Sequence, residues 1–293
     1  MKIGIIGFDT SHSYVFPAYF KELAQKTDDK YKAIQVELGW AGDPSTAVHP
    51  EELDNMRKGI SDIGIKGVDS LEKLIPQCDA FMLECVNGDT HLEIAKKILP
   101  LKKPTFIDKP FANNTADAKE IASIAKKYGT PCWSSSALRF EPTMLEAIKK
   151  AGTCLEADIY GPAPYFAKGR GIVYYGIHTS EMIFTIMGTG LKSVQTNWQD
   201  DREIIVGTWK DGRKAVLRGR RKPIHGFGGT VHGTEGSFSF PGNGDFYAGL
   251  TRNIADFFLT GSIPVTLDVT VEVIAFLDAA VLSKEQGGKE ILV

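Results

Sequence analysis

Short apolar runs alternate with helical patterns along the first part of the chain, and this alternation limits the folds open to it. The run Lys2–Ile6 ends at Gly7, as a buried strand does. Similar runs follow at Asp79–Cys85 and Thr105–Ile107, and a helical pattern at Thr115–Tyr128 ends in a Gly-Thr-Pro turn. Strands that alternate with helices at this spacing predict a doubly wound parallel sheet of the Rossmann type.

The second half of the sequence changes character, because strand patterns there follow one another with glycine turns between them. Glu203–Lys210 and Gly236–Phe240 alternate apolar and polar residues, and Val269–Ser283 is a long helical pattern near the end. The sequence therefore predicts an α/β domain at 1–133, followed at 134–293 by an α+β domain with a largely antiparallel open sheet.

Charge and composition exclude several classes of partner. A formal net charge of -2 over 293 residues gives no electrostatic attraction to nucleic acid or to an anionic membrane. No apolar run approaches the ~20 residues of a membrane span, and the N-terminus lacks a signal-peptide pattern. The four cysteines show no CxxC spacing, which predicts reduced thiols rather than a zinc ribbon or a redox pair. We therefore expect a cytoplasmic protein that binds a small molecule.

The turn after the first strand departs from the dinucleotide fingerprint G-x-G-x-x-G. The chain keeps Gly7 but has Asp9 and His12 at the second and third glycine positions. A carboxylate ~4 Å from a phosphate costs about 4 kcal/mol at an effective dielectric of ~20, more than the ~0.3–1 kcal/mol that a helix N-terminus returns. Dinucleotide binding is therefore expected to be weakened, unless Asp9 turns away to cap the next helix or a protonated His12 neutralises it.

Five segments occur in an order that is typical of one enzyme family. In chain order they are Asn87 with His91, Asp108–Lys109–Pro110 after a strand, Leu138–Pro142, Gly176–Ile177–His178 before a helix, and Gly233–Ser237. Together they resemble the Gfo/Idh/MocA oxidoreductases over essentially the whole chain. The resemblance implies a dinucleotide-binding domain followed by an α/β domain that grips the substrate and often forms the oligomer interface through its open sheet.

The resemblance also implies an activity. Relatives are NAD(P)-dependent enzymes that act mostly on sugars and polyols, so we expect NAD or NADP as cofactor, without a choice between them. The expected reaction transfers a hydride between a sugar- or polyol-like hydroxyl and the nicotinamide. A homodimer or homotetramer through the C-terminal sheet is expected.

Three residues are the candidate catalytic groups. Lys109 matches the family lysine, whose ammonium can donate or relay a proton beside a reacting hydroxyl. His178 matches the histidine that bonds the substrate hydroxyl or takes its proton. Tyr174 stands where many relatives have an aspartate, and a phenol does not replace a carboxylate at neutral pH. Either Tyr174 acts as a hydroxyl relay or alcohol oxidation is impaired, and Glu181 could orient His178 from the next turn.

The candidate cofactor-binding residues lie just after the predicted strands. They are Gly7, Phe8, Asp9, Thr10, Ser11, His12, Asp43, Asn87, His91, Asp108, Lys109 and Pro110. Asp43 either binds the adenosine ribose or belongs to the Asp-Pro turn beyond that position. No metal site is predicted, because Asp9, His12, His178, His225 and His232 lack tight ligand spacing.

Two other functions remain open at this stage. The missing glycines and the missing aspartate favour a cofactor-less relative that binds a small ligand in the cleft. Alternatively, a retained NAD could serve lyase, epimerase or glycosidase chemistry.

Overall fold

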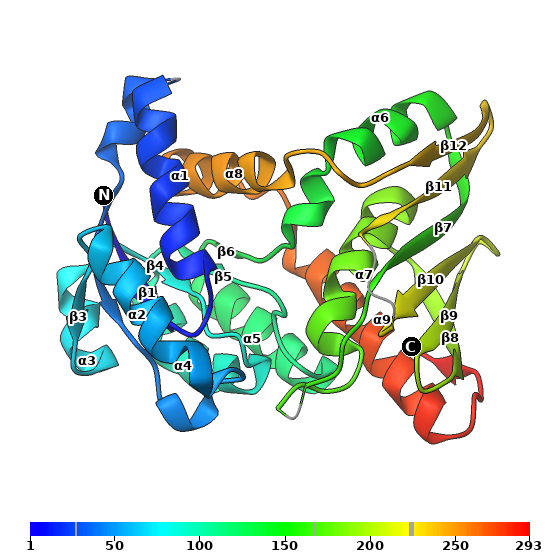
Figure 1. Cartoon of the computed structure of the whole chain (residues 1–293), viewed down its shortest axis with the longest axis horizontal. Coiled ribbons are helices and arrows are strands. Elements are labelled where there is room, and N and C mark those ends of the chain that lie inside the picture. Colours follow the sequence, from blue (N-terminus) through cyan, green and yellow to red (C-terminus); the bar gives the residue numbers. More distant parts are fainter. Residues whose placement is uncertain (27, 167, 223–225) are drawn as a thin grey trace. The chain divides into compact units, whose positions relative to one another are not determined.

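A computed structural model describes residues 1–26, 28–166, 168–222 and 226–293 of the chain (Figure 1). These residues form two compact units. The first comprises Met1–Ala112, Ala116–Ser135 and Leu250–Leu267, and the second comprises Asn113–Thr115, Ser136–Gly249 and Asp268–Val293. The chain therefore leaves the first unit and later returns to it, rather than building one domain after the other.

Six parallel strands form the sheet of the first unit, in the order β3-β2-β1-β4-β5-β6. The strands are β1 (Lys2–Ile6), β2 (Gln35–Trp40), β3 (Lys66–Val68), β4 (Ala80–Leu83), β5 (Thr105–Ile107) and β6 (Cys132–Trp133). The central strands β1 and β4 are buried along nearly their whole length, as strands covered on both faces must be. This strand order is that of the doubly wound dinucleotide-binding fold, so the predicted fold class is confirmed.

Helices connect these strands. The α-helices are α1 (His12–Lys26), α2 (Leu53–Asp62), α3 (Leu71–Leu74), α4 (His91–Ile98) and α5 (Thr115–Tyr128), and the 3₁₀ helices are η1 (Asp29–Ala33), η2 (Pro44–Thr46), η3 (Pro50–Glu52), η4 (Ile75–Gln77), η5 (Gly88–Thr90) and η6 (Leu99–Leu101). The sequence predicts that the first helix begins at Phe16, which would put Pro17 in its first turn. In the structure α1 begins at His12, and Pro17 lies inside the helix.

The helix α8 (Phe246–Thr260) returns the chain to the first unit. Its Phe257 packs against Trp133 with ring centroids 6.1 Å apart. Its Asp256 accepts hydrogen bonds from Lys30 Nζ at 2.8 Å and from the Tyr31 hydroxyl at 3.1 Å. The sequence assigns this stretch to the second domain, because the apolar pattern of a helix does not say which sheet the helix covers.

Seven strands form the sheet of the second unit, in the order β12-β11-β7-β10-β9-β8-β13. The strands are β7 (Cys154–Pro162), β8 (Leu191–Trp198), β9 (Arg202–Trp209), β10 (Lys214–Arg220), β11 (Gly228–Gly233), β12 (Gly236–Phe240) and β13 (Ile291–Leu292). Neighbours are antiparallel except for β10 and β7, which are parallel. The largely antiparallel sheet is confirmed, although its strand β7, which lies between β11 and β10, is absent from the sequence prediction.

The helices of the second unit are α6 (Pro142–Ala151), α7 (Val173–Met187) and α9 (Leu267–Glu285), preceded by the 3₁₀ helix η7 (Ala137–Phe140). Most residues of α7 are buried, including polar ones such as His178, Ser180 and Glu181. A helix buried on nearly all sides needs partners for its polar side chains, and those partners define the candidate site of this unit.

Among the described residues, no helix is both long enough and apolar enough to cross a bilayer. All four cysteines are free thiols, as the sequence predicts. Burial raises the pKa of Cys132 to about 12 and raises that of Cys85 further, so these thiols stay protonated and behave as small apolar side chains.

Candidate functional site

The residues predicted to bind a dinucleotide meet at one edge of the first unit's sheet. Gly7–His12 follow β1, Asn87 and His91 follow β4, and Asp108–Pro110 follow β5. Because β1, β4 and β5 are parallel neighbours, their carboxyl ends lie at the same edge. The structure therefore brings together most of the predicted set, at the edge where doubly wound sheets bind their ligands.

Gly7 makes the sharp turn at the end of β1. Its φ is +97°, and a Cβ at this position would lie 2.5 Å from the backbone nitrogen of Cys85 on the neighbouring strand end. Its own N–H donates to the carbonyl of Trp40 at 2.8 Å. Phe8 then points away from the edge and packs in the core against Ile60 and Ile65, so the structure does not place its side chain in the candidate site.

Replacing Gly7 with alanine is expected to lower the free energy of unfolding by about 2–4 kcal/mol, because the new Cβ meets backbone and the φ is left-handed. Urea unfolding measures the loss. Gly67→Ala is the matched control: a Cβ there meets nothing within 4 Å, so its effect is expected to stay within about 0.5 kcal/mol. Equal effects of the two substitutions would contradict the close approach of β1 and β4.

The Asp-Thr-Ser-His turn adopts neither arrangement expected from the sequence. Asp9 turns away from the helix, but its Oδ1 accepts from the backbone N–H of Val86 at 3.2 Å instead of capping α1. The Thr10 hydroxyl accepts from the N–H of His12 at 3.3 Å, so Thr10 caps the first residue of the helix. His12 Nδ1 lies 2.7 Å from Asp108 Oδ2, so the imidazole pairs with Asp108 rather than with Asp9.

Three buried carboxyl groups, those of Asp9, Glu84 and Asp108, lie at this edge. Burial raises the pKa of Asp9. Burial and the neighbouring Asp108 raise the pKa of Glu84 well above its usual range, and the Lys109 ammonium offsets only part of this. Burial also opposes ionisation of Asp108, but His12 and Lys109 outweigh it and hold the pKa of Asp108 below its usual range. Of the three groups, Asp108 is therefore the one whose charged form is most favoured.

Asn87 and His91 have structural partners. Asn87 caps η5 by accepting from the N–H of Asp89 at 3.1 Å. His91 is fully buried, with Nε2 at 2.7 Å from the carbonyl of Cys85 and Nδ1 at 3.1 Å from the carbonyl of Phe111. Burial lowers the pKa of His91, and the neutral ring holds the segment after β4 against the segment after β5.

Asp43 belongs to the turn beyond β2. Its Oδ1 accepts from the N–H of Ser45 at 2.9 Å, and it caps η2. The strand ends at Trp40, so Asp43 stands three positions past the strand end. This geometry supports the turn alternative of the two considered in the sequence.

Lys109 and Pro110 come after Asp108 at the end of β5 and are joined by a cis peptide bond. Lys109 is half-buried, whereas its neighbours Asp108 and Pro110 are buried. Its ammonium charge acts on both Glu84 and Asp108, so this edge of the sheet combines one lysine with the carboxyl groups described above.

His178 lies in the second unit, on α7. The hydroxyl of Ser136 is 2.6 Å from its Nδ1. The rings of Tyr175 and Phe227 pack against it edge-to-face, with centroids 4.9 and 5.6 Å away. Tyr174, by contrast, packs on Phe166 with centroids 4.4 Å apart. Of the two tyrosines, Tyr175 is therefore the one whose ring packs on the histidine, and Tyr174 packs on Phe166.

Glu181 has a different partner from the one expected. The carboxylate, 2% exposed, forms an ion pair with Arg139, whose Nε donates to it at 2.6 Å. Burial raises the pKa of Glu181, and Arg139 opposes this. The sequence does not predict that Ser136, Tyr175 and Phe227 surround His178. The one sequence signal for any of them is that Ser136 lies close to the predicted domain boundary.

The metal ligands considered in the sequence do not form one group in the part of the chain that the structure describes. His225 lies outside the described residues. His232 is paired with Ser237 at 2.7 Å and with Asp158 at 3.5 Å in the second unit, whereas Asp9 and His12 belong to the first.

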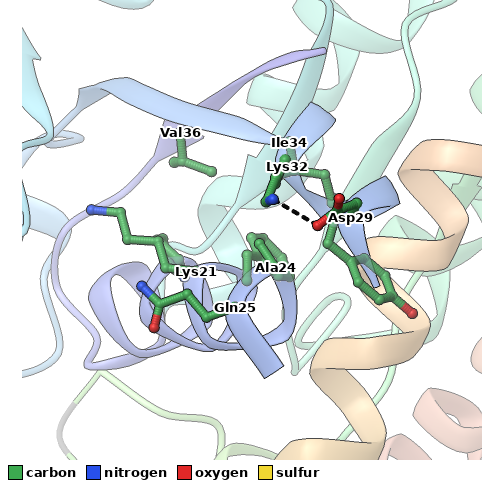
Figure 2. Close-up of a pocket in the computed structure, with 10 residues that line it drawn as sticks. Lys21, Ala24, Gln25, Asp29, Lys32, Ile34 and Val36 are labelled. Carbon is green, nitrogen blue, oxygen red and sulfur yellow. Dashed lines mark ion pairs between the residues drawn. The ribbon is translucent and has the colours of Figure 1, made fainter. Parts of the chain in front are cut away.

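A hollow of ≈ 480 Å³ on the first unit lies away from this edge (Figure 2). Lys21, Ala24 and Gln25 of α1 line it, together with the ion pair of Lys32 and Asp29 at 2.6 Å. Ile34 and Val36 place it at the amino end of β2. Because the candidate site lies at the carboxyl ends of the strands, this hollow is not part of it.

Known proteins resemble the chain in sequence and in fold. An uncharacterised oxidoreductase of Escherichia coli K12, YhhX, is 32% identical over 117 residues, which is 36% of this chain and about a third (34%) of that protein. The solved structure of GenD2 from gentamicin A biosynthesis, in complex with NAD, superposes with a TM-score of 0.79 at 14% identity, over 100% of this chain and 96% of that one. A myo-inositol dehydrogenase of Lactobacillus casei, in complex with NAD(H) and myo-inositol, gives 0.79 at 15% identity, with the same 100% and 96% coverage.

The two structures share the fold of the whole chain, at identities that support no more than the fold. The sequence of residues 1–136 matches the family model of the Gfo/Idh/MocA oxidoreductases, described as an oxidoreductase family with an NAD-binding Rossmann fold. That match covers the sheet edge described above, including Gly7, His12, Asp108 and Lys109. In residues 1–136 the chain is therefore similar to the Gfo/Idh/MocA oxidoreductases.

Proposed function

We propose that this protein is an NAD(P)-linked oxidoreductase that transfers a hydride between a sugar- or polyol-like hydroxyl and the nicotinamide. The observation that carries the proposal is the position of Lys109. It is a half-buried lysine two residues past the end of β5, at the carboxyl edge of a sheet whose sequence matches an NAD-binding family. A cation at that edge can stabilise a developing alkoxide and exchange a proton with it.

The turn after β1 is suited to the pyrophosphate of a dinucleotide. Among the described residues, the backbone N–H groups of Thr10 and Ser11 donate to no protein acceptor. They stand immediately before the N-terminus of α1, where unpaired N–H groups and the helix dipole favour an anion. Gly7–Ser11 would therefore hold the pyrophosphate, and the bound nicotinamide would supply or accept the hydride.

His178 is the second residue assigned to proton handling. Ser136 holds its Nδ1, and the rings of Tyr175 and Phe227 fix the plane of the imidazole. A ring held in one orientation loses little entropy when it hydrogen-bonds a substrate hydroxyl. An imidazole can accept a proton at neutral pH while hydride leaves the carbon that bears the hydroxyl. The Tyr174 ring packs on Phe166, and a hydroxyl relay through Tyr174 stays a prediction.

One observation favours a second candidate function, a family member that binds a small ligand without a dinucleotide. Asp9 replaces a fingerprint glycine, and the charged Asp108 lies at the same edge of the sheet, so the site carries negative potential that opposes a pyrophosphate. The backbone donors and Lys109 oppose this potential, and we place dinucleotide binding first for that reason.

Titration with NADH and with NADPH, followed by tryptophan fluorescence, tests the proposal. Trp40 ends β2 beside the Gly7 turn, so a bound dinucleotide is expected to change its emission and to saturate. Free nicotinamide is the control and is expected to give no saturable change. If neither dinucleotide changes the emission up to millimolar concentration, the oxidoreductase proposal fails and the second candidate stands.

Asp9→Asn is expected to tighten NADH binding by about tenfold or more, because a carboxylate ~8 Å from a phosphate costs about 2 kcal/mol at an effective dielectric of ~20. The amide oxygen can still accept from Val86, so the turn keeps its shape. Because burial raises the pKa of Asp9, the wild type loses this charge as pH falls, and the gain is expected to shrink at low pH.

The same fluorescence titration measures this gain. Asp54→Asn, at an exposed carboxylate of α2, is the control and is expected to leave the Kd unchanged. An Asp9→Asn protein that binds NADH no better than Asp54→Asn would show that Asp9 does not face the phosphates.

A further inference from the structure

Glu84 is a buried carboxyl group that the proposed reaction does not use. It directly follows β4 and is 0% exposed. Neither of its oxygens has a hydrogen-bond partner among the described residues. Such a group is costly, because burial removes water and nothing replaces it. In a native protein this arrangement needs an explanation, and a bound cation is one of the few available.

Two other side chains face Glu84 from separate segments of the chain. His12 comes from the first turn of α1, and Asp108 from the end of β5. One donor atom from each of the three residues lies within 4.8 Å of the donor atoms of the other two, and all three residues are buried. Asp108 Oδ2 is occupied by His12 at 2.7 Å, but Asp108 Oδ1 has no hydrogen-bond partner among the described residues. The unsatisfied oxygens therefore belong to one cluster.

Protonation alone does not satisfy this cluster. A proton on Glu84 removes its charge, but the resulting hydroxyl still lacks an acceptor in the arrangement described, and the carbonyl oxygen still lacks a donor. His12 is already directed at Asp108. A single cation between the three side chains would engage Glu84, the open oxygen side of Asp108 and the imidazole together.

The geometry points to a binding site for a divalent first-row transition-metal cation, formed by His12, Glu84 and Asp108. Zinc bonds to imidazole nitrogen and carboxylate oxygen at about 2.0–2.2 Å, which puts neighbouring ligand atoms about 3–3.5 Å apart. The cluster is within a small side-chain movement of that spacing. One nitrogen and two oxygens suit Zn²⁺ or Mn²⁺, whereas Ca²⁺ requires six to eight oxygens.

The site would lie beside the Gly7 turn and Lys109, and its occupation would change the charge of that edge. A dication held by Glu84 and Asp108 would make this edge more favourable for an anionic ligand than it is without the metal. The inference does not depend on the proposed oxidoreductase activity, since the three residues can bind a cation whether or not a dinucleotide binds.

Metal binding is tested on the full-length protein after treatment with a chelator and removal of that chelator. Calorimetric titrations with Zn²⁺, Mn²⁺ and Mg²⁺ measure affinity and stoichiometry, and thermal melting measures stabilisation. We expect about one Zn²⁺ or Mn²⁺ per chain, a higher Tm with that metal, and weaker binding of Mg²⁺. Failure of the wild type to bind Zn²⁺ or Mn²⁺ up to millimolar concentration overturns the inference.

The variants Glu84→Gln and Asp108→Asn test whether the metal binds at this cluster. Each is expected to weaken metal affinity by at least about 100-fold. Without metal, Glu84→Gln is expected to melt at or above the temperature of the wild type, because it removes a buried carboxyl group that lacks partners. A protein that merely lost its fold would not give this pair of results. Glu141→Gln, at a buried carboxylate that caps α6 in the second unit, is the control and is expected to bind metal like the wild type.

If Glu84→Gln binds Zn²⁺ as tightly as Glu141→Gln does, the ion sits elsewhere and the inference fails. These outcomes are separate from those of the NADH titration, which is repeated on the metal-free protein. A protein that binds metal but no dinucleotide contradicts only the proposed function, and one that binds dinucleotide but no metal contradicts only the cation site.

Discussion

Lys109→Ala is expected to lower kcat by about 10²–10⁴-fold while the Kd for NADH stays within about threefold of the wild type. Lysine at this position would act on the reacting hydroxyl, whereas the pyrophosphate would be held by the turn after β1. The measurement is steady-state turnover with a panel of sugars and polyols that includes myo-inositol, together with the fluorescence titration of NADH.

Lys109→Arg separates two roles of the lysine. Arginine keeps the positive charge but does not release a proton at neutral pH. If the lysine relays a proton, Lys109→Arg is expected to be about as slow as Lys109→Ala. If only its charge matters, the arginine variant recovers most of the rate. Lys97→Ala, at an exposed lysine paired with Glu72, is the control for a lost surface charge, and a fully active Lys109→Ala would remove the proposed role.

Arg139→Met is expected to destabilise the protein by about 3–5 kcal/mol, because it leaves the carboxylate of Glu181 buried without its counter-ion. Burial already raises the pKa of Glu181 with the arginine present. Without it the folded-state pKa rises further above the unfolded value. The folded state then binds the proton more tightly, so the loss of stability is expected to shrink as pH falls through that pKa.

Urea unfolding at several pH values measures this effect. The double variant Arg139→Met with Glu181→Leu is expected to recover most of the stability, because it removes both buried charges. Arg202→Met breaks an exposed ion pair with Asp201 and is expected to leave stability unchanged. If Arg139→Met and Arg202→Met behave alike, the buried pair does not contribute as proposed.

The sequence predicts the secondary structure well where the spacing of apolar residues and the positions of Gly or Pro indicate the same element ends. The bounds of β1, β5 and α5 are those expected from the apolar runs and the Gly or Pro residues around them. The strand β7 escapes prediction because its alternation is interrupted by exposed polar and apolar residues at Leu155 and Glu156. Such a strand is recognised only from the neighbours that pair with it, which are distant in sequence.

The candidate site is predictable in position but not in its contacts. The rule that ligands bind at the carboxyl ends of parallel strands predicts that Gly7, Asp108 and Lys109 lie at one edge of the sheet, and the structure places them there. Their binding of a ligand stays a prediction. The pairing of His12 with Asp108 joins residues 96 positions apart, and no local pattern encodes it. In the sequence Glu84 is one residue at the end of an apolar strand pattern. It becomes a candidate only because the structure buries its carboxyl oxygens without hydrogen-bond partners among the described residues.

The return of the chain through α8 determines how this protein can be divided. A chain that stops after Ser135 contains every strand of the dinucleotide-binding sheet, yet it lacks Phe257 against Trp133 and Asp256 against Lys30. Such a fragment would expose an indole that is fully buried in the intact chain. Independent expression of this half therefore requires joining Leu250–Leu267 to it by a linker, and a partner or regulator that displaced α8 would loosen the nucleotide-binding half from a distance.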